Sequence, residues 1–198
     1  MKRQRTSCCH IRSDRSDARC HGNLRSRYDL SEDGCSGRHA SRLPRGSALT
    51  DALMVLITAV EEFERFVEVE DLRRIAASVL AAENVPAAEL GVLVTDDDAV
   101  RRLNAEYAGE DASTDVLAFS LREGEEFVSP DGVMRLGEVI ISYPTASRQA
   151  AEAGRLVDEE IVHLLVHGIL HLLGYDHAEA EEARRMRQRE SELLAGSS

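Results

Sequence analysis

The order of apolar and polar positions divides residues 50–198 into short apolar runs and longer segments with helical spacing. Continuous runs of about four to eight apolar residues suit buried strands, whereas apolar residues that recur about every three or four positions suit amphipathic helices. We therefore predict strands at 54–60, 90–95, 116–121 and 137–142, and helices at 67–85, 96–109, 144–153, 156–173 and 178–194. A loop with glycine and proline at 123–135 separates the last two strands.

These elements predict a single small α+β domain, in which a mixed β-sheet of about four strands packs with about five helices. The pattern does not determine the order of the strands. Aliphatic side chains must fill the core, because the sequence contains four phenylalanines, four tyrosines and no tryptophan.

Residues 1–49 differ from the rest of the chain in composition. They contain eleven Lys and Arg against five Asp and Glu, whereas the other 149 residues contain thirteen against thirty-one. The segment is rich in Ser, Arg and Gly and has no apolar periodicity, so it cannot bury enough apolar surface to offset the ordering of its backbone. We predict a disordered basic extension at 1–49 and a folded domain at 50–198. A start codon assigned too far upstream, with Met54 or a neighbour as the true beginning, is an alternative.

All four cysteines, Cys8, Cys9, Cys20 and Cys35, lie in this extension, and their spacing lacks the paired C-x-x-C of a structural zinc site. No apolar segment follows the basic start, so the sequence does not indicate a signal peptide. No run of about twenty apolar residues is present to span a bilayer, and we expect no membrane partner. A cysteine-free domain suits a reducing compartment, so we expect a cytoplasmic protein.

Three histidines near the C-terminus have the spacing of a metal site. His167, His171 and His177 stand in the run HGILHLLGYDH. Residues four apart on a helix share one face, and Gly174 allows the chain to leave the helix and return His177 toward the other two. Three imidazoles with an open fourth position are typical of catalytic zinc, so we predict one Zn²⁺ per chain, on a central helix and the turn that follows it. Ordinary histidines of an amphipathic helix are the weaker alternative.

The same run can be compared with the zinc-protease motif H-E-x-x-H-x-x-G-x-x-H, which it matches at the three histidines and the glycine. The protease's general base, a glutamate, is replaced by Gly168, which can neither take nor give a proton. The metal ligands are therefore kept and the base for peptide hydrolysis is lost.

The run HGILHLLGYDH, preceded by LNAEYAGEDASTDVLAFS and GEVIIS, closely resembles the YbeY family of bacterial metal-dependent endoribonucleases from about Leu103 to His177. The resemblance implies a small α+β domain whose zinc is bound by the three histidines. It also implies a hydrolase that acts in rRNA maturation and ribosome quality control. Where the family usually has Tyr-Arg-Gly, this chain has Tyr107, Ala108 and Gly109, so the arginine thought to assist phosphodiester chemistry is missing. Ala118 and Ser120 also replace the serine and proline that are common in the family.

Four further residues are candidates for the site. His163 could orient a ligand or contact substrate, or could be a packed helical histidine. Asp176 could hold a ligand imidazole or accept a proton as a catalytic residue, or could be an ordinary turn aspartate. Thr114 and Asp115 could bind substrate in the cleft, or could simply begin a strand.

The sequence supports three functions in descending order. The first, which the resemblance implies, is a zinc-dependent endoribonuclease that cuts single-stranded rRNA at the 3′ end of the small-subunit rRNA, with the ribosome or pre-ribosomal particles as partners and no DNA substrate. The second is a non-catalytic or weakly catalytic ribosome-assembly factor stabilised by its metal, which Ala108 favours, and the third is a zinc peptidase. The negative charge of residues 50–198 counts against RNA binding, although zinc would add two positive charges at the cleft. Arg101, Arg102, Arg122 and Arg148 are candidates to replace the missing arginine, and fit equally well as surface charges.

Overall fold

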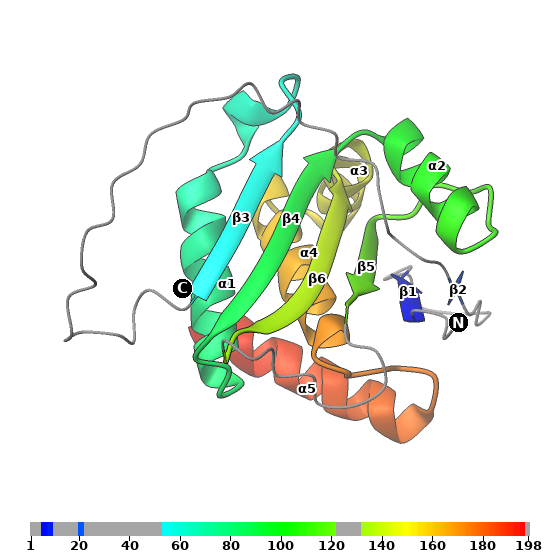
Figure 1. Cartoon of the computed structure of the whole chain (residues 1–198). Coiled ribbons are helices and arrows are strands. Elements are labelled where there is room, and N and C mark those ends of the chain that lie inside the picture. The colour runs from blue at the N-terminus through cyan, green and yellow to red at the C-terminus, as the bar shows by residue number, and fades with distance from the viewer. Residues whose placement is uncertain (1–4, 10–19, 22–52, 122–131, 197–198) are drawn as a thin grey trace, which may run out of the picture.

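A mixed sheet forms the centre of the molecule (Figure 1). The computed structural model describes residues 5–9, 20–21, 53–121 and 132–196. The four main strands are β3 (Leu53–Ala59), β4 (Ala88–Thr95), β5 (Val116–Ser120) and β6 (Met134–Ser142). Strand β4 lies between β3 and β6 and is parallel to both, and β5 pairs antiparallel with β6. The predicted mixed sheet and its four strands are confirmed.

Five α-helices are described: α1 (Val69–Ala82), α2 (Asp97–Tyr107), α3 (Tyr143–Ala153), α4 (Val157–Leu172) and α5 (Ala180–Gly196). Each lies within a predicted helical segment or within two residues of one. One short 3₁₀ turn, η1 (Glu64–Phe66), was not predicted. Helix α5 packs on α4. The single α+β domain predicted from the apolar pattern is therefore confirmed.

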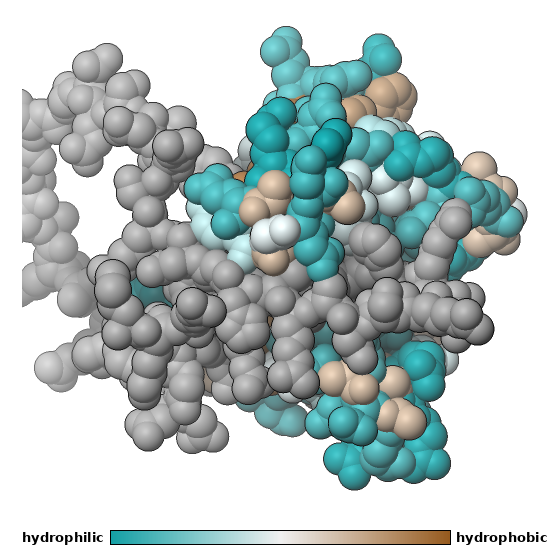
Figure 2. Space-filling view, turned by 90° about the vertical axis from the view of Figure 1, so that its right-hand side faces the viewer, coloured by the Kyte–Doolittle hydropathy of each residue, from teal (hydrophilic) through white to brown (hydrophobic). Residues whose placement is uncertain are grey.

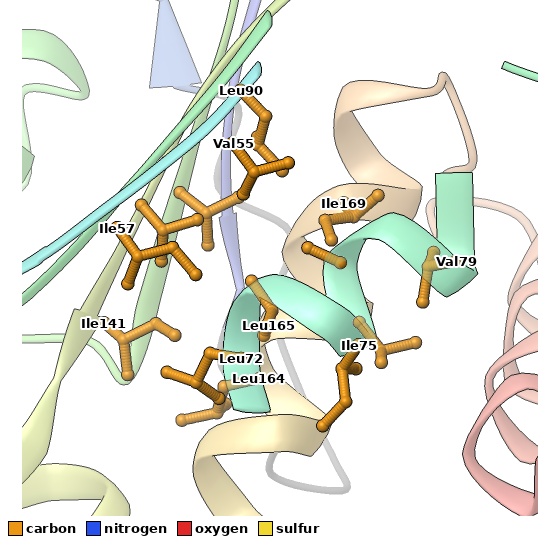
Figure 3. Packing of buried hydrophobic residues seen from close by; sticks show 14 of the residues in the cluster. Val55, Ile57, Leu72, Ile75, Val79, Leu90, Ile141, Leu164, Leu165 and Ile169 are labelled. Atoms are coloured by element: carbon orange, nitrogen blue, oxygen red, sulfur yellow. The ribbon is translucent and has the colours of Figure 1, made fainter. Parts of the chain in front are cut away.

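The two faces of the sheet are covered by different helices. Residues Val139 and Ile141 of β6 belong to the main core with α1 and α4, whereas Ile140 belongs to a smaller cluster with Val100 of α2. Successive side chains of a strand point to opposite faces, so α2 lies on the face opposite α4. Figure 3 shows the main core, where aliphatic side chains from the strands meet those of α1 and α4. Helix α4 is therefore held against the sheet along most of its length.

Two short strands, β1 (Arg5–Cys9) and β2 (Cys20–His21), extend the sheet to six strands in the order β2-β1-β5-β6-β4-β3. Strand β1 pairs antiparallel with β5. Residues 1–49 have no apolar periodicity, but pairing at a sheet edge uses backbone groups and does not need it. The rest of that segment lies outside the described residues, so the division near residue 49 stays a prediction.

The described surface shown in Figure 2 is mostly hydrophilic, with apolar side chains scattered over it. Among the described helices, none combines the length and the apolar character that crossing a membrane requires. The predicted loop at 123–135 falls largely outside the described residues, as does Arg122.

Candidate metal centre

Helix α4 places two histidines side by side in the interior. His167 and His171 are one helical turn apart and are only 6% and 8% exposed. Their Nε2 atoms lie 3.1 Å from each other. Two nitrogens bound to one tetrahedral zinc at about 2.0–2.1 Å lie about 3.3–3.4 Å apart, so the two rings already have nearly the separation of a shared ligand pair.

A glycine-dependent turn brings the third histidine to this pair. Helix α4 ends at Leu172, and Gly174 follows with a φ of +98°, a conformation that side chains other than glycine's rarely adopt. The backbone N–H of Tyr175 donates to the carbonyl of Leu170 at 3.0 Å, which closes a Schellman-type end. The chain then turns back, and the ring of His177 lies 5.0 Å from that of His171.

The three side chains together fit one metal ion. One nitrogen from each of His167, His171 and His177 lies within 4.8 Å of the other two. Neutral imidazole nitrogens are ligands that zinc and other divalent transition metals accept readily, and three of them leave a position open. Because His177 is exposed while the other two are buried, the group is open to solvent at the turn. The convergence expected from the spacing is therefore present in the structure.

A carboxylate from another helix contacts this group, and it was not among the predicted site residues. Glu190 of α5 is 7% exposed, and its Oε1 accepts a hydrogen bond from Nδ1–H of His167. Burial raises the pKa of Glu190, but the hydrogen bond from His167 and the nearby histidines outweigh it, so the pKa lies below its ordinary value. The charged residues of the run 179–192 are typical of a solvent-facing helix, but Glu190 is buried. Its spacing from Ala183, Met186 and Leu193, all buried, is the helical signal that could have identified it.

Comparisons with known proteins identify the family of this chain. The family model described as Endoribonuclease YbeY matches residues 58–198. The chain belongs to the YbeY family. A protein of Desulforamulus reducens named Endoribonuclease YbeY is 45% identical over 148 residues, which cover 72% of this chain and 95% of that protein. A protein of the same name from Chloroflexus aurantiacus is 47% identical over 130 residues, which cover 63% and 84% of the two chains. The family resemblance inferred from the motifs is confirmed.

A solved structure supports the fold. The solution structure of TM1509 from Thermotoga maritima aligns with a TM-score of 0.52 and 22% identity, covering 73% of this chain and 89% of that one. This similarity concerns the fold alone.

Gly168, which stands where a protease would carry its glutamate, faces the sheet in this YbeY chain. A Cβ added at Gly168 would lie 2.6 Å from Cγ1 of Val139, a separation too short for real carbon atoms. A side chain at this position would point into the core and away from any substrate. The position therefore serves close packing of α4 on β6, and the geometry agrees with the low rank of the peptidase hypothesis.

Asp176 and Asp115, two of the candidate site residues, accept hydrogen bonds from the backbone. Asp176 is exposed, and its Oδ1 accepts from the N–H of His177 at 2.7 Å, so it stabilises the turn that carries the third histidine. Asp115 is buried, and its Oδ1 accepts from the N–H of Val116 at 2.9 Å. Its Oδ2 accepts from Gln149 of α3 at 2.9 Å. These contacts agree with structural roles, and the catalytic role of Asp176 and the substrate role of Asp115 stay predictions.

Thr114 and Asp115 line a small cavity of about 220 Å³ together with Thr145, Arg148 and Gln149. The hydroxyl of Thr114 donates to Asp115 at 3.0 Å. None of the described residues that line this cavity is a histidine, so the three-histidine group does not form part of its wall. Substrate binding by Thr114 stays a prediction.

His163 lies one turn before His167 on α4 but is not part of the converging group. Its Nδ1 is 3.8 Å from Oε1 of Glu160, which is buried and paired with Arg155 at 2.6 Å. Burial lowers the pKa of His163, and the charges of Glu190 and Glu160 oppose this effect. A neutral, largely buried imidazole fits the packed histidine, and a site role for His163 stays a prediction.

Two of the arginines considered as replacements for the missing family arginine, Arg101 and Arg148, have carboxylate partners. Arg101 binds Asp111 through two hydrogen bonds of 2.6 and 2.9 Å. Arg148 donates to Asp97 at 3.0 Å. Ala108 itself is the C-terminal cap residue of α2, and its N–H donates to the carbonyl of Asn104 at 2.8 Å. Recruiting Arg101 or Arg148 to a phosphodiester would require breaking an existing ion pair.

Proposed function

We propose that this YbeY protein is a zinc-dependent endoribonuclease that cuts single-stranded rRNA in the cytoplasm, with the 3′ end of the small-subunit rRNA as its target. The observation that carries the proposal is the convergence of His167, His171 and His177 on one point, in a chain that is 45% identical to a protein named Endoribonuclease YbeY. The ribosome or a pre-ribosomal particle is the proposed partner, because this substrate is an rRNA end.

The three histidines would hold the metal ion from two different environments, a buried helix and an exposed turn. His167 and His171 offer their nitrogens from a rigid buried helix, and His177 closes the group from the exposed turn. A zinc ion held there supplies Lewis-acid polarisation of the phosphoryl group and of the attacking water. The backbone N–H of His177 is fixed by Asp176, which keeps the open side of the group in place for an approaching phosphodiester.

The net negative charge of residues 50–198 limits the electrostatic contribution to RNA binding. Residues 50–198 carry thirteen Lys and Arg against thirty-one Asp and Glu, and Arg101 and Arg148 are already paired. A surface of this kind cannot release many counterions, so RNA binding must depend on the metal and on a few local contacts. This favours a short, single-stranded end over a long duplex.

A second function, ribosome assembly without efficient cleavage, is favoured by one feature. Ala108 replaces the arginine that the family usually carries, and alanine cannot stabilise the charge that develops on a phosphodiester in the transition state. In this case the metal would stabilise the fold of a binding protein.

Cleavage of defined RNAs by the purified full chain tests the proposal. We expect a single-stranded RNA to be cut internally after loading with zinc, cleavage to stop on chelation, and a duplex of the same sequence and a peptide to remain intact. Absence of RNA cleavage by fully loaded protein, with ribosome binding retained, would favour the assembly function. Cleavage of the peptide would overturn both the endoribonuclease function and the assembly function.

A further inference from the structure

The buried carboxylate of Glu190 requires an explanation beyond packing. A carboxylate taken out of water is costly unless hydrogen bonds or charges compensate it. Glu190 is 7% exposed and obtains its compensation from His167, which is itself 6% exposed. An apolar residue would fill the same position at no such cost, because Ala183, Met186 and Leu193 already form a buried stripe on the same face of α5.

The hydrogen bond between Glu190 and His167 stabilises one tautomer of the His167 ring. A neutral imidazole has a single N–H, and when Nδ1 donates to Glu190, Nε2 is left with its lone pair. Nε2 is the atom that faces His171 at 3.1 Å. The carboxylate therefore stabilises the tautomer in which His167 can bind a metal, as carboxylates behind metal-bound histidines commonly do.

A second cluster holds α5 and the histidine turn together. Arg189, which is next to Glu190, donates to Glu83 at 2.6 Å and to the carbonyl of Ala82 at 3.0 Å, both at the C-terminal end of α1. The hydroxyl of Tyr175 donates to the other oxygen of Glu83 at 3.0 Å. One carboxylate thus contacts both α5 and the turn two residues before His177.

We propose that Glu190 is a positioning residue of the metal centre, and that Glu83 anchors the two segments which bring Glu190 and His177 to it. The inference rests on the proposed function only in that the three histidines hold zinc. Neither residue contacts substrate. Both act through His167 and His177, and their loss lowers metal affinity while the helices remain folded.

Zinc affinity of the purified full chain, measured by competition with a chromophoric chelator, tests the proposal. We expect Glu190→Ala to weaken zinc binding by about 10–100-fold, the range seen when a partner of a metal-bound histidine is removed. Zinc binding should weaken less in Glu190→Gln than in Glu190→Ala, because an amide oxygen can still accept a hydrogen bond from Nδ1–H of His167. The zinc affinity of Glu83→Gln should lie between those of the wild type and Glu190→Ala. The control Glu182→Gln removes a charge from an exposed position of the same helix and should bind zinc as the wild type does.

Nitrogen NMR of the His167 ring in the metal-free wild type gives an independent readout. We expect the proton on Nδ1, and a dominant Nε2–H tautomer would overturn the proposal even if Glu190→Ala failed to fold. Folded Glu190→Ala that binds zinc as tightly as the wild type would also overturn it. Because these measurements use no RNA, an inactive wild type with normal zinc binding would count against the proposed function and leave this inference standing.

Discussion

Gly168 and Val139 are in closer contact than any side chain would allow. A Cβ on Gly168 would lie 2.6 Å from Cγ1 and 3.0 Å from Cγ2 of Val139. This approach sets the depth at which α4 lies on the sheet, and the histidine at the preceding position is placed by the same contact. Gly168 stands where a protease carries its catalytic glutamate, and it is thus also the residue that allows α4 to pack closely on β6.

Substitution of this glycine should destabilise the fold. We expect Gly168→Ala to lower the free energy of unfolding by about 1–3 kcal/mol through overpacking, although alanine favours a helix by about 1 kcal/mol. Urea denaturation measures the change. In a Val139→Ala background the same substitution should cost less, because the overlapping methyl groups are gone. An equal cost in both backgrounds would show that the contact with Val139 is not the cause.

Ala108 should limit the rate of RNA cleavage. A guanidinium near the reacting phosphate stabilises transition-state charge, and we expect Ala108→Arg to raise cleavage by the equivalent of about 2–4 kcal/mol. Zinc affinity should hardly change, because residue 108 is not a ligand. Single-turnover cleavage of a single-stranded RNA measures the effect, with Ala108→Lys as a control for charge without the planar fork.

Two results would contradict this expectation. A wild type as active as its arginine-bearing relatives, with no gain in Ala108→Arg, would show that another residue such as Arg102 or Arg122 supplies the charge. Inactivity of both forms at full zinc occupancy, with ribosome binding retained, would support the assembly function.

Asp97 should make the fold sensitive to acid. Burial raises the pKa of Asp97, but hydrogen bonds from Ser142, Thr145 and Arg148 outweigh it, so the pKa lies below its ordinary value of 3.8. A lowered pKa stabilises the folded state at pH values above the unfolded pKa, and this contribution is lost as the pH falls through the folded value. We expect Asp97→Asn to cost about 1 kcal/mol at pH 7, because the group is partly open to solvent.

The difference between Asp97→Asn and the wild type should shrink as the pH falls below about 4. Urea denaturation between pH 7 and pH 3 measures it. Asp98→Asn, at an exposed position in the same helical turn, is the matched control and should show no comparable pH dependence. A constant difference across this range would mean that ionisation of Asp97 is not the source.

Removal of residues 1–49 should leave the metal centre intact. The match to the family begins at residue 58, and the three histidines lie on α4 and the following turn. We expect unchanged zinc content and a change in melting temperature below about 3 °C, which corresponds to about 1 kcal/mol for a chain of this size. A loss of several degrees would show that pairing of β1 with β5 contributes to stability.

Much of this structure follows from local patterns. The strands around Val55 and Val92 and the helix that carries His167 and His171 were predictable, because period and spacing depend on neighbours in the chain. The return of His177 was predictable for the same reason, since Gly174 can take a positive φ. The position of β5 beside β6 was not predictable, because it depends on pairing between segments far apart in sequence.

Glu190 shows why the rest of the site could not be predicted. It contacts His167 from 23 residues away, across the junction of α4 and α5. The charged run that surrounds it indicated a solvated helix, and only the weaker spacing of Ala183, Met186 and Leu193 points to the buried face. The position of Glu190 on the same helix face as these three apolar residues was the only local indication that its carboxylate is buried. Its partner could be named only once the two helices were placed together.

The metal content of the purified full chain tests the central claim most directly, because every further step depends on the three histidines holding an ion. We predict about one tightly bound zinc per chain. The variant with His167→Ala, His171→Ala and His177→Ala should bind none, whereas His163→Ala, which alters a histidine outside the group, should keep its zinc. Zinc retained by the folded triple variant, or absent from folded wild type after loading, would contradict the account.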